Sequence, residues 1–573
     1  MLFLLILLAG PVICLLYGFN IVSRWRMRHV PGPRPSWLMG NVLQMGPPGK
    51  SHDAMQRWAE EYGPVYRYFL GRRPCVVISD PELVRQVSVK RFINYHDRSL
   101  PLLQFGSACD SMFQNSGILF ARGKYWLGIR TACEPLFHTA ALASYAPMMN
   151  RAVDQLLDKL QTGSHSGDGI CVSELLKGMS MDVIGDTAFG VDFKAQKEGS
   201  SSRLVESAEA MFAPFAGMPF LTAALSFAVP DLGWLWYRFA LIISPKTVQK
   251  TVSGRRYIWG ASQALLDSAR KQGADSAAST GQATGIAAGE TRVGKVGKGA
   301  AESVAKAAEQ SAAFQQASKA MAGQVPPESS IVSRLKDAVN KQTGERLSDL
   351  DVCAQLFTFL LAGYETTSVA LSFSLYLLAH HPEHQQRVMQ EVDAFGGREL
   401  GYADLASCPY IEAVFQESMR LYPPVSALLA LAREPKQGGV DLVLSNGSTM
   451  HLPDACRVMF NIWTLHRDER YWPEPAAFKP DRFLPSTPSG KVEASANHSG
   501  SYFPFGLGPR KCIGWRFAME EGVLCLARVF QRFEIRLDTE RHQGPLDLRS
   551  SVTLNPEGGI WIRVTERKQG SVL

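Results

Sequence analysis

A run of apolar residues opens the chain. Residues 2–19 carry no charged side chain, and the first charge is Arg24. An uncharged stretch of this length approaches the roughly 20 residues that a helix needs to cross a bilayer. A cleavable signal peptide would carry basic residues before the apolar run, whereas here Arg24, Arg26 and Arg28 follow it. The pattern predicts a retained transmembrane signal-anchor over residues 1–23, with the rest of the chain in the cytosol.

A basic and proline-rich segment, residues 24–35, follows the apolar run and includes Val30-Pro31-Gly32-Pro33-Arg34-Pro35. Proline fixes φ and cannot continue a helix, so this segment is predicted to be a stiff hinge. After it, short β-type segments such as Val65–Leu70 and Cys75–Ile78 alternate with longer helical patterns.

The strongest helical signal starts at Ser348. Ser348 is a suitable N-cap, Asp349 and Asp351 lie in the first turn, and Pro382 limits the end. A helix of about 32 residues is about 48 Å long, which is enough to cross a domain. A second transmembrane helix is the alternative, because both flanks are apolar. Glu365 interrupts the middle, where a charge is costly in lipid, so a buried helix with a functional site is favoured.

Residues 273–330 differ in composition from the rest of the chain. Ala, Gly and Ser dominate this segment, and Phe314 is its only aromatic residue. A segment with so few large apolar side chains cannot bury enough surface to order itself. It is therefore predicted to be a disordered surface insertion, with transient helix over residues 300–322.

Charge and cysteine content narrow the function classes. The net charge is +7 over 573 residues, and no long Lys/Arg run indicates a nucleic-acid partner. The ten cysteines are scattered without a C-x-x-C pair. This distribution favours reduced thiols in a cytosol-facing protein over a disulfide scaffold or a structural zinc site.

One cysteine is distinguished by its neighbours. Cys512 follows the loop Phe503-Pro504-Phe505-Gly506-Leu507-Gly508-Pro509-Arg510-Lys511 and precedes a predicted helix that begins near Gly514. Glycines let a backbone approach a bulky group, and free N–H groups at a helix start stabilise a thiolate, the form that binds iron. A buried free cysteine, the alternative, would not account for the aromatic, glycine and basic residues around it.

This loop resembles the haem-ligand signature of the cytochrome P450 family, F-x-x-G-x-R-x-C-x-G. Its fixed positions are matched by Phe505, Gly508, Arg510, Cys512 and Gly514. Four further motifs of the family occur in the family's order: W-x-x-x-R at Trp126 and Arg130, the oxygen-activation motif at Ala362-Gly363-Tyr364-Glu365-Thr366-Thr367, E-x-x-R at Glu417-Ser418-Met419-Arg420, and P-E-R-F at Pro480-Asp481-Arg482-Phe483, with Asp for Glu. Five motifs in register indicate a member of this family.

The resemblance implies a mainly α fold with a smaller β-rich lobe, the cytochrome P450 fold, over residues 36–573 behind the N-terminal anchor. It also implies haem b, with Cys512 as the axial ligand of the iron. An indole N–H and guanidinium groups suit the haem propionates. The implied cofactor-binding residues are Cys512, Arg510, Trp126, Arg130, Arg433 and Phe505.

Two residues of the long helix are the implied catalytic pair. Glu365 and Thr366 would lie opposite Cys512 across the haem, where a carboxylate and a hydroxyl can carry protons to dioxygen. The thiolate would favour O–O cleavage. The alternative for Thr366 is a hydrogen bond to a carbonyl of its own helix.

Three residues have an implied structural role. Glu417 and Arg420 lie three apart, on one face of a helix, and Arg482 can join them in a buried network. The alternative is an exposed pair, which stabilises a protein by at most about 1 kcal/mol.

The implied activity is insertion of one oxygen atom from O2 into an apolar substrate. Electrons would come from NADPH through NADPH–cytochrome P450 reductase, with cytochrome b5 as a further partner. A candidate basic docking face consists of Lys511, Arg516, Arg528 and Arg532. The expected location is the endoplasmic reticulum membrane, with a single span and a cytosolic catalytic domain; the plastid envelope is the alternative.

Two rival functions and the substrate stay open at this point. The rivals are a peroxide-dependent isomerase or dehydratase of the same family and a non-catalytic haem-binding protein; Glu365 and Thr366 argue against both. Lipids, sterols, terpenoids and xenobiotics all fit an apolar pocket. The family analogy places pocket residues at Phe105, Phe113, Phe359, Ala362, Leu428, Leu429 and Leu554.

Overall fold

The computed structural model describes residues 21–37, 39–47, 49–98, 116–199, 202–217, 238, 242–243, 245–279, 309–426, 433–444, 446–454, 456–484, 500–550 and 552–567. Most of these residues are helical. The helices are α2 (Ser51–Tyr62), α3 (Pro81–Arg85), α5 (Gly123–Cys133), α6 (Thr139–Ser166), α7 (Val172–Ile184), α8 (Ala195–Glu198), α9 (Arg203–Gly217), α12 (Pro245–Ser279), α14 (Ala312–Met321), α15 (Ile331–Leu335), α16 (Asp349–His380), α17 (Pro382–Asp393), α18 (Pro409–Leu421), α19 (Ile462–Leu465) and α20 (Trp515–Arg532).

The strands form small sheets beside the helices. They are β1 (Val65–Leu70), β2 (Arg73–Ile78), β3 (Ile170–Cys171), β4 (Val440–Val443), β5 (Thr449–Leu452), β6 (Arg457–Phe460), β7 (Phe533–Leu537), β8 (Leu548–Ser550), β9 (Leu554–Pro556) and β10 (Trp561–Glu566). The strand orders are β1-β2-β6, β3-β10-β7, β4-β5 and β8-β9. Among the described residues, a mainly α fold with a smaller β-rich lobe is therefore confirmed.

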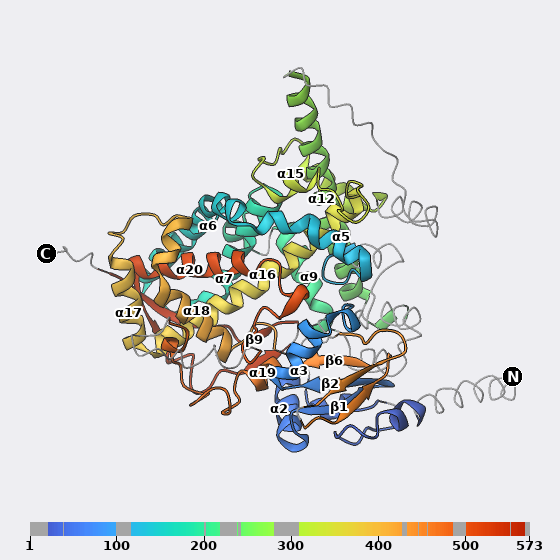
Figure 1. Cartoon of the computed structure of the whole chain (residues 1–573). Helices are drawn as coiled ribbons and strands as arrows, with labels where there is room; N and C mark the ends of the chain where they lie inside the picture. Colours follow the sequence, from blue (N-terminus) through green and yellow to red (C-terminus); the bar gives the residue numbers. More distant parts are fainter. Residues whose placement is uncertain are drawn as a thin grey trace.

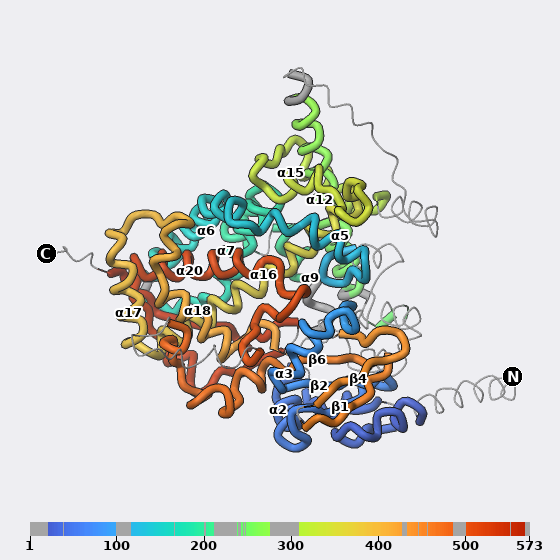
Figure 2. Tube along the Cα trace, in the orientation of Figure 1, coloured from blue at the N-terminus to red at the C-terminus, as the bar shows by residue number. Residues whose placement is uncertain are grey.

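The β-rich lobe joins segments from distant parts of the sequence. β1 and β2 are antiparallel, with Val65 opposite Ile78, and β6 lies parallel to β2, with Arg457 opposite Cys75. Figure 2 shows the two blue strands beside the orange β6. The loops that follow β6 are thereby anchored against the N-terminal part of the domain.

The helix α16 crosses the centre of the helical region (Figure 1). Its predicted start is confirmed: Ser348 Oγ accepts from the backbone N–H of Asp351 at 3.2 Å, and the Asp351 carboxylate accepts from the backbone N–H of Ser348. Such a capping box satisfies two N–H groups that the helix leaves unpaired. α16 packs against α7, α12, α18 and α20.

Within the described part of the chain, α16 is the single helix with the length and apolarity of a membrane span, and 67% of its most apolar window is buried inside the protein. Its apolar flanks are therefore covered by other helices, as expected of a core helix. The predicted anchor falls mostly on residues 1–20, which lie outside the described residues.

The segment 273–330 differs in part from the predicted disordered insertion. α12 continues to Ser279, and α14 is a packed helix whose buried Phe314 ring lies 6.2 Å from that of Trp259. A Cβ at Gly260 would lie 2.5 Å from the Phe314 carbonyl oxygen, so this glycine allows the close approach. The spacing of Phe314, Ala317 and Met321 gives α14 one apolar face, which composition alone concealed. Residues 280–308 lie outside the described residues.

Candidate haem site

The Cys512 loop has a conformation that requires glycine. Gly508 has φ +71°, and a Cβ there would lie 1.9 Å from the carbonyl oxygen of Ser88. The backbone N–H of Cys512 donates to the carbonyl oxygen of Phe505 at 2.8 Å. α20 begins at Trp515, as the sequence predicted. The loop therefore presents Cys512 immediately before a helix start.

The surroundings of Cys512 favour its charged form in some respects and oppose it in others. Its side chain is solvent-accessible, although protein atoms crowd it closely enough that desolvation raises the pKa of the thiol. The backbone N–H of Gly514 and the charges of Arg130, Arg98 and Lys511 lower that pKa. Binding of iron would favour the thiolate further.

Three guanidinium groups gather beside this loop. Arg98 donates to the carbonyl oxygen of Arg510 at 3.0 Å, and the backbones of Arg98 and Arg433 form an isolated β-bridge. Burial, with repulsion from Arg98, lowers the pKa of Arg510 to about 8 and holds the pKa of Arg433 well below its usual range. Among the described residues, the one ion pair made by these three side chains joins Arg510 Nη2 to Asp97 at 3.9 Å.

The positive charges of this cluster are only partly balanced by protein groups. Among the described residues, neither Arg433 Nη1 nor Arg98 Nε has a hydrogen-bond partner, although both atoms are buried. A buried cation is costly unless it is paired, and carboxylates match the guanidinium fork. The two propionate groups of a haem would supply two negative charges to this cluster. The residues around Cys512 therefore fit this cofactor. Arg98, which was not predicted, belongs to this set.

Two residues of α5 flank the same loop. The Trp126 ring lies 4.0 Å from the Arg510 guanidinium carbon, and Arg130 Nη1 donates to the carbonyl oxygen of Lys511 at 2.8 Å. The structure therefore brings the predicted Trp126, Arg130 and Arg510 together beside Cys512.

On α16, the predicted catalytic pair makes two different contacts. Glu365 Oε1 accepts from Asn555 Nδ2 at 3.1 Å, while Glu365 Oε2 is buried and has no hydrogen-bond partner in the described part of the chain. Burial raises the pKa of Glu365, and hydrogen bonds from Thr553 and Asn555 oppose that rise. Thr366 Oγ1 donates to the carbonyl oxygen of Ala362 at 2.6 Å, which is the local bond considered as the alternative. The lone pairs of that hydroxyl stay available as acceptors.

The predicted pocket residues are only partly described. Ala362 is exposed, whereas Phe359 is buried with its ring 5.5 Å from that of Phe137. Leu554 has no accessible surface, so it packs in the core of this structure. The other four predictions, Phe105, Phe113, Leu428 and Leu429, lie outside the described residues.

The network around Glu417 is buried. Glu417 accepts from Arg420 Nε at 2.7 Å and from Arg420 Nη2 at 2.8 Å, and Arg482 Nε lies 3.4 Å from Glu417 Oε1. The remaining N–H groups of Arg420 reach the carbonyl oxygens of His466, Pro475 and Ala477. This network ties α18 to the loops that lead to the Cys512 segment.

The candidate basic face is divided. Lys511 Nζ and the Arg516 guanidinium lie 3.8 and 4.4 Å from the centre of the Trp515 ring. Arg528 instead pairs with Asp154 at 2.7 Å, and Arg532 donates to Gln161. The last two are therefore committed to the surface of α6.

Comparisons with known proteins agree with this geometry. A family model described as Cytochrome P450 matches residues 30–250 and 291–563. The chain is similar to cytochrome P450 3A12 of Canis lupus familiaris, with 29% identity over 99% of this chain and 97% of that protein. It is 28% identical to a thromboxane-A synthase of Macaca fascicularis over 96% of this chain and 94% of that protein. It is also 26% identical to a lithocholate 6-beta-hydroxylase of Mesocricetus auratus over 97% and 95% of the two chains. The chain therefore belongs to the cytochrome P450 family, the haem-containing monooxygenases whose electrons come from NADPH through a reductase.

Proposed function

We propose that this chain is a membrane-anchored monooxygenase in which Cys512 is the axial ligand of the haem iron. The observation that carries the proposal is the accessible Cys512 in a glycine-dependent loop beside three clustered arginines, two of which have a buried N–H without a hydrogen-bond partner among the described residues. Residues 1–23 would be the anchor, 24–35 the hinge, and 36–573 the haem domain. Loss of bound haem in Cys512→Ala, with Cys525→Ala as a buried-cysteine control, tests this assignment.

Each residue has a distinct task in this proposal. When bound, the haem supplies the redox chemistry that activates dioxygen. Arg98, Arg433 and Arg510 would bind its propionates, and the Trp126 ring lies against the Arg510 guanidinium. Arg130 holds the Cys512 loop through the Lys511 carbonyl.

Glu365 and Thr366 would move protons on the side of the haem away from Cys512. A carboxyl group whose pKa is raised by burial can bind and release a proton closer to neutral pH than an exposed one. Asn555 in β9 and Thr553, the residue before that strand, orient it, and the Thr366 hydroxyl can accept and pass on a proton. Glu365→Gln should slow product formation at saturating reductase while leaving haem content unchanged.

The proposed substrate is an apolar molecule of the lipid, sterol, terpenoid or xenobiotic class. Support comes from the similarity to a protein named lithocholate 6-beta-hydroxylase. Binding spectra recorded across a panel of these classes, followed by turnover with NADPH and reductase, test it. A panel in which only charged, water-soluble compounds bind would contradict it.

A second candidate is a peroxide-dependent isomerase. One observation favours it: the similarity to a protein named as a synthase rather than a hydroxylase. Product formed from a hydroperoxide without NADPH or reductase would support this candidate. Strict dependence of every product on NADPH and O2 would support the monooxygenase.

The proposed electron donor is NADPH–cytochrome P450 reductase, with cytochrome b5 as a further partner, at the endoplasmic reticulum membrane. Lys511 and Arg516 beside Trp515 are the candidate docking charges. Lys511→Ala should slow reduction of the haem iron, most strongly at low salt. Arg536→Ala, which changes an exposed side chain of β7, is the matched control.

A further inference from the structure

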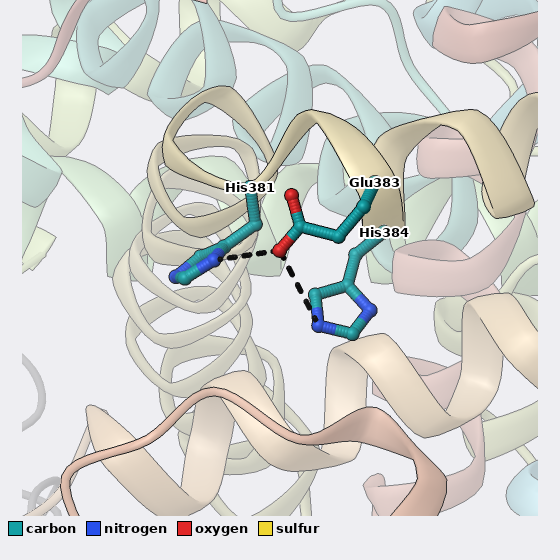
Figure 3. A group of neighbouring side chains, drawn as sticks. All are labelled: His381, Glu383 and His384. Atoms are coloured by element: carbon teal, nitrogen blue, oxygen red, sulfur yellow. Dashed lines mark hydrogen bonds and ion pairs between the residues drawn. The ribbon is translucent and has the colours of Figure 1, made fainter.

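The junction between α16 and α17 gathers three side chains of metal-binding type. His381 is the residue between the two helices, and Glu383 and His384 lie in the first turn of α17. One ligand atom from each lies within 4.8 Å of the others. Figure 3 shows the two imidazoles directed at the same carboxylate oxygen of Glu383.

The distance from His381 to Glu383 matches that of a tetrahedral zinc site, and the distance from His384 to Glu383 is longer. Bonds of about 2.0–2.1 Å from nitrogen or oxygen place tetrahedral ligand atoms about 3.3 Å apart. His381 Nδ1 lies 3.2 Å from Glu383 Oε1, and His384 Nε2 lies 3.9 Å from the same oxygen. A movement of His384 Nε2 by a fraction of an ångström would bring it to the tetrahedral distance from Glu383 Oε1.

A direct hydrogen bond to Glu383 does not explain why the His384 imidazole lies beside this carboxylate. His384 Nδ1 lies 2.6 Å from the Tyr410 hydroxyl. If Nδ1 carries the proton, Nε2 presents a lone pair to the carboxylate, which is unfavourable without a cation between them. If Nε2 carries it, the 3.9 Å separation from Glu383 Oε1 is too long for a hydrogen bond. With either tautomer, His384 and Glu383 do not form a hydrogen bond with each other.

The surroundings hold the imidazoles in place. The rings of His381 and His384 lie 5.3 and 5.2 Å from the ring of Phe478. Metal-binding histidines commonly use their second ring nitrogen for a hydrogen bond that fixes tautomer and orientation, as Tyr410 does here for His384. The neighbouring Arg387 is neutralised by two 2.8 Å bonds to Asp481.

From this geometry we propose that His381, Glu383 and His384 form a Zn²⁺-binding site at the junction between α16 and α17, which holds the residue before α17 to the first turn of that helix. Two imidazoles and one carboxylate are a known zinc donor set, and the exposed Glu383 leaves a fourth position for water. The site lies in the helical region on the side away from the β1-β2-β6 sheet (Figure 1). The role we assign to it is stabilisation of this junction, and the proposal is independent of the proposed function.

The test uses the full-length haem protein without a polyhistidine tag. The protein is dialysed against micromolar Zn²⁺, and zinc and iron are quantified by atomic emission. One zinc per haem is expected in the wild type and none in His381→Ala or His384→Ala. Tyr410→Phe keeps all three ligands and should weaken zinc binding by about tenfold or more.

The matched control is His451→Ala. His451 forms an exposed pair with Asp441, with Nδ1 2.8 Å from Oδ1, and no third metal-binding side chain joins them among the residues that the structure describes. This variant should bind zinc as the wild type does. Zinc should also raise the thermal midpoint of the wild type and not that of His384→Ala. Equal zinc content in the wild type and His384→Ala, or no zinc in the wild type, would overturn the proposal.

Discussion

Asn555 Nδ2 donates a hydrogen bond of 3.1 Å to Glu365 Oε1, joining the C-terminal strand β9 to the middle of α16 across 190 positions of sequence. The same amide donates to Thr553 Oγ1 at 2.8 Å. The carboxyl group proposed to handle protons is thereby positioned by a segment outside its own motif.

This contact predicts a shift in pH dependence. The hydrogen bonds of Asn555 and Thr553 lower the pKa of Glu365 against the larger effect of burial, which raises it. Asn555→Ala removes one of these two lowering contributions, so the kinetic pKa that belongs to Glu365 should move to higher pH. The pH profile of kcat with any productive substrate measures this, and Glu365→Gln should lack that pKa. An unchanged profile in Asn555→Ala would refute the positioning role.

The Glu417–Arg420 pair predicts a large loss of stability. Both side chains have no exposed surface. Removing one partner leaves a buried charge uncompensated, which costs about 3–5 kcal/mol. Glu417→Ala should therefore lower the midpoint of chemical unfolding sharply and reduce haem content. Glu417→Gln keeps the shape of the side chain, and its unfolding midpoint should lie between those of Glu417→Ala and the wild type.

Glu174 and Lys177 provide the control, because they have the same spacing on α7 but are solvent-exposed in part. Glu174→Ala should leave the midpoint nearly unchanged. Similar losses in Glu174→Ala and Glu417→Ala would contradict the network's role.

Two buried carboxyl groups on α20 predict an alkaline loss of stability. Burial raises the pKa of Glu521 to about 8, and burial with the neighbouring Glu521 does the same for Glu520. Because the folded state holds these protons more tightly than the unfolded state, stability is greatest below the unfolded pKa of 4.5 and falls as pH rises through about 8. Each unit of pKa difference corresponds to about 1.4 kcal/mol.

Glu521→Gln removes one of these groups and keeps its volume beside Ser180 Oγ, which donates to Glu521 at 2.8 Å. Unfolding midpoints between pH 5 and 9 should fall less steeply in this variant than in the wild type. Glu534→Gln, at the surface on β7, should keep the wild-type slope. A wild-type slope in Glu521→Gln would show that this group is charged in the folded protein.

The arginine cluster predicts opposite effects on the protein with and without haem. Arg433 is buried beside Arg98 and Arg510, so its charge is unfavourable until an anion binds. Arg433→Met should stabilise the haem-free protein and weaken haem retention. Thermal unfolding of both forms, with haem transfer to an acceptor protein, measures the two effects. Destabilisation of the haem-free form would contradict the cluster's need for an anion.

Local signals in the sequence predicted those features whose residues lie close together along the chain. Ser348 and Asp351 lie within one turn, so their capping box could be inferred from spacing. Glu417 and Arg420 likewise share one helix face. The Cys512 loop was evident because its glycines lie beside the cysteine in sequence.

The missed features depend on pairing between distant segments. Arg98 reaches the site because its backbone pairs with that of Arg433, and no residue near Arg98 indicates this. Asn555 belongs to none of the sequence motifs, and it contacts Glu365 only because of where β9 lies in the fold. Phe314 lies in a segment of small residues, and its packing depends on Gly260 in another helix.

The most direct test of the central claim, that Cys512 binds the haem iron as a thiolate, is the absorption spectrum of the reduced, CO-treated protein. The wild type should show the red-shifted Soret band typical of a thiolate ligand, and Cys512→Ala should lose it while Cys525→Ala keeps it. An imidazole-like band in the wild type, or a red-shifted band that persists in Cys512→Ala, would contradict the assignment.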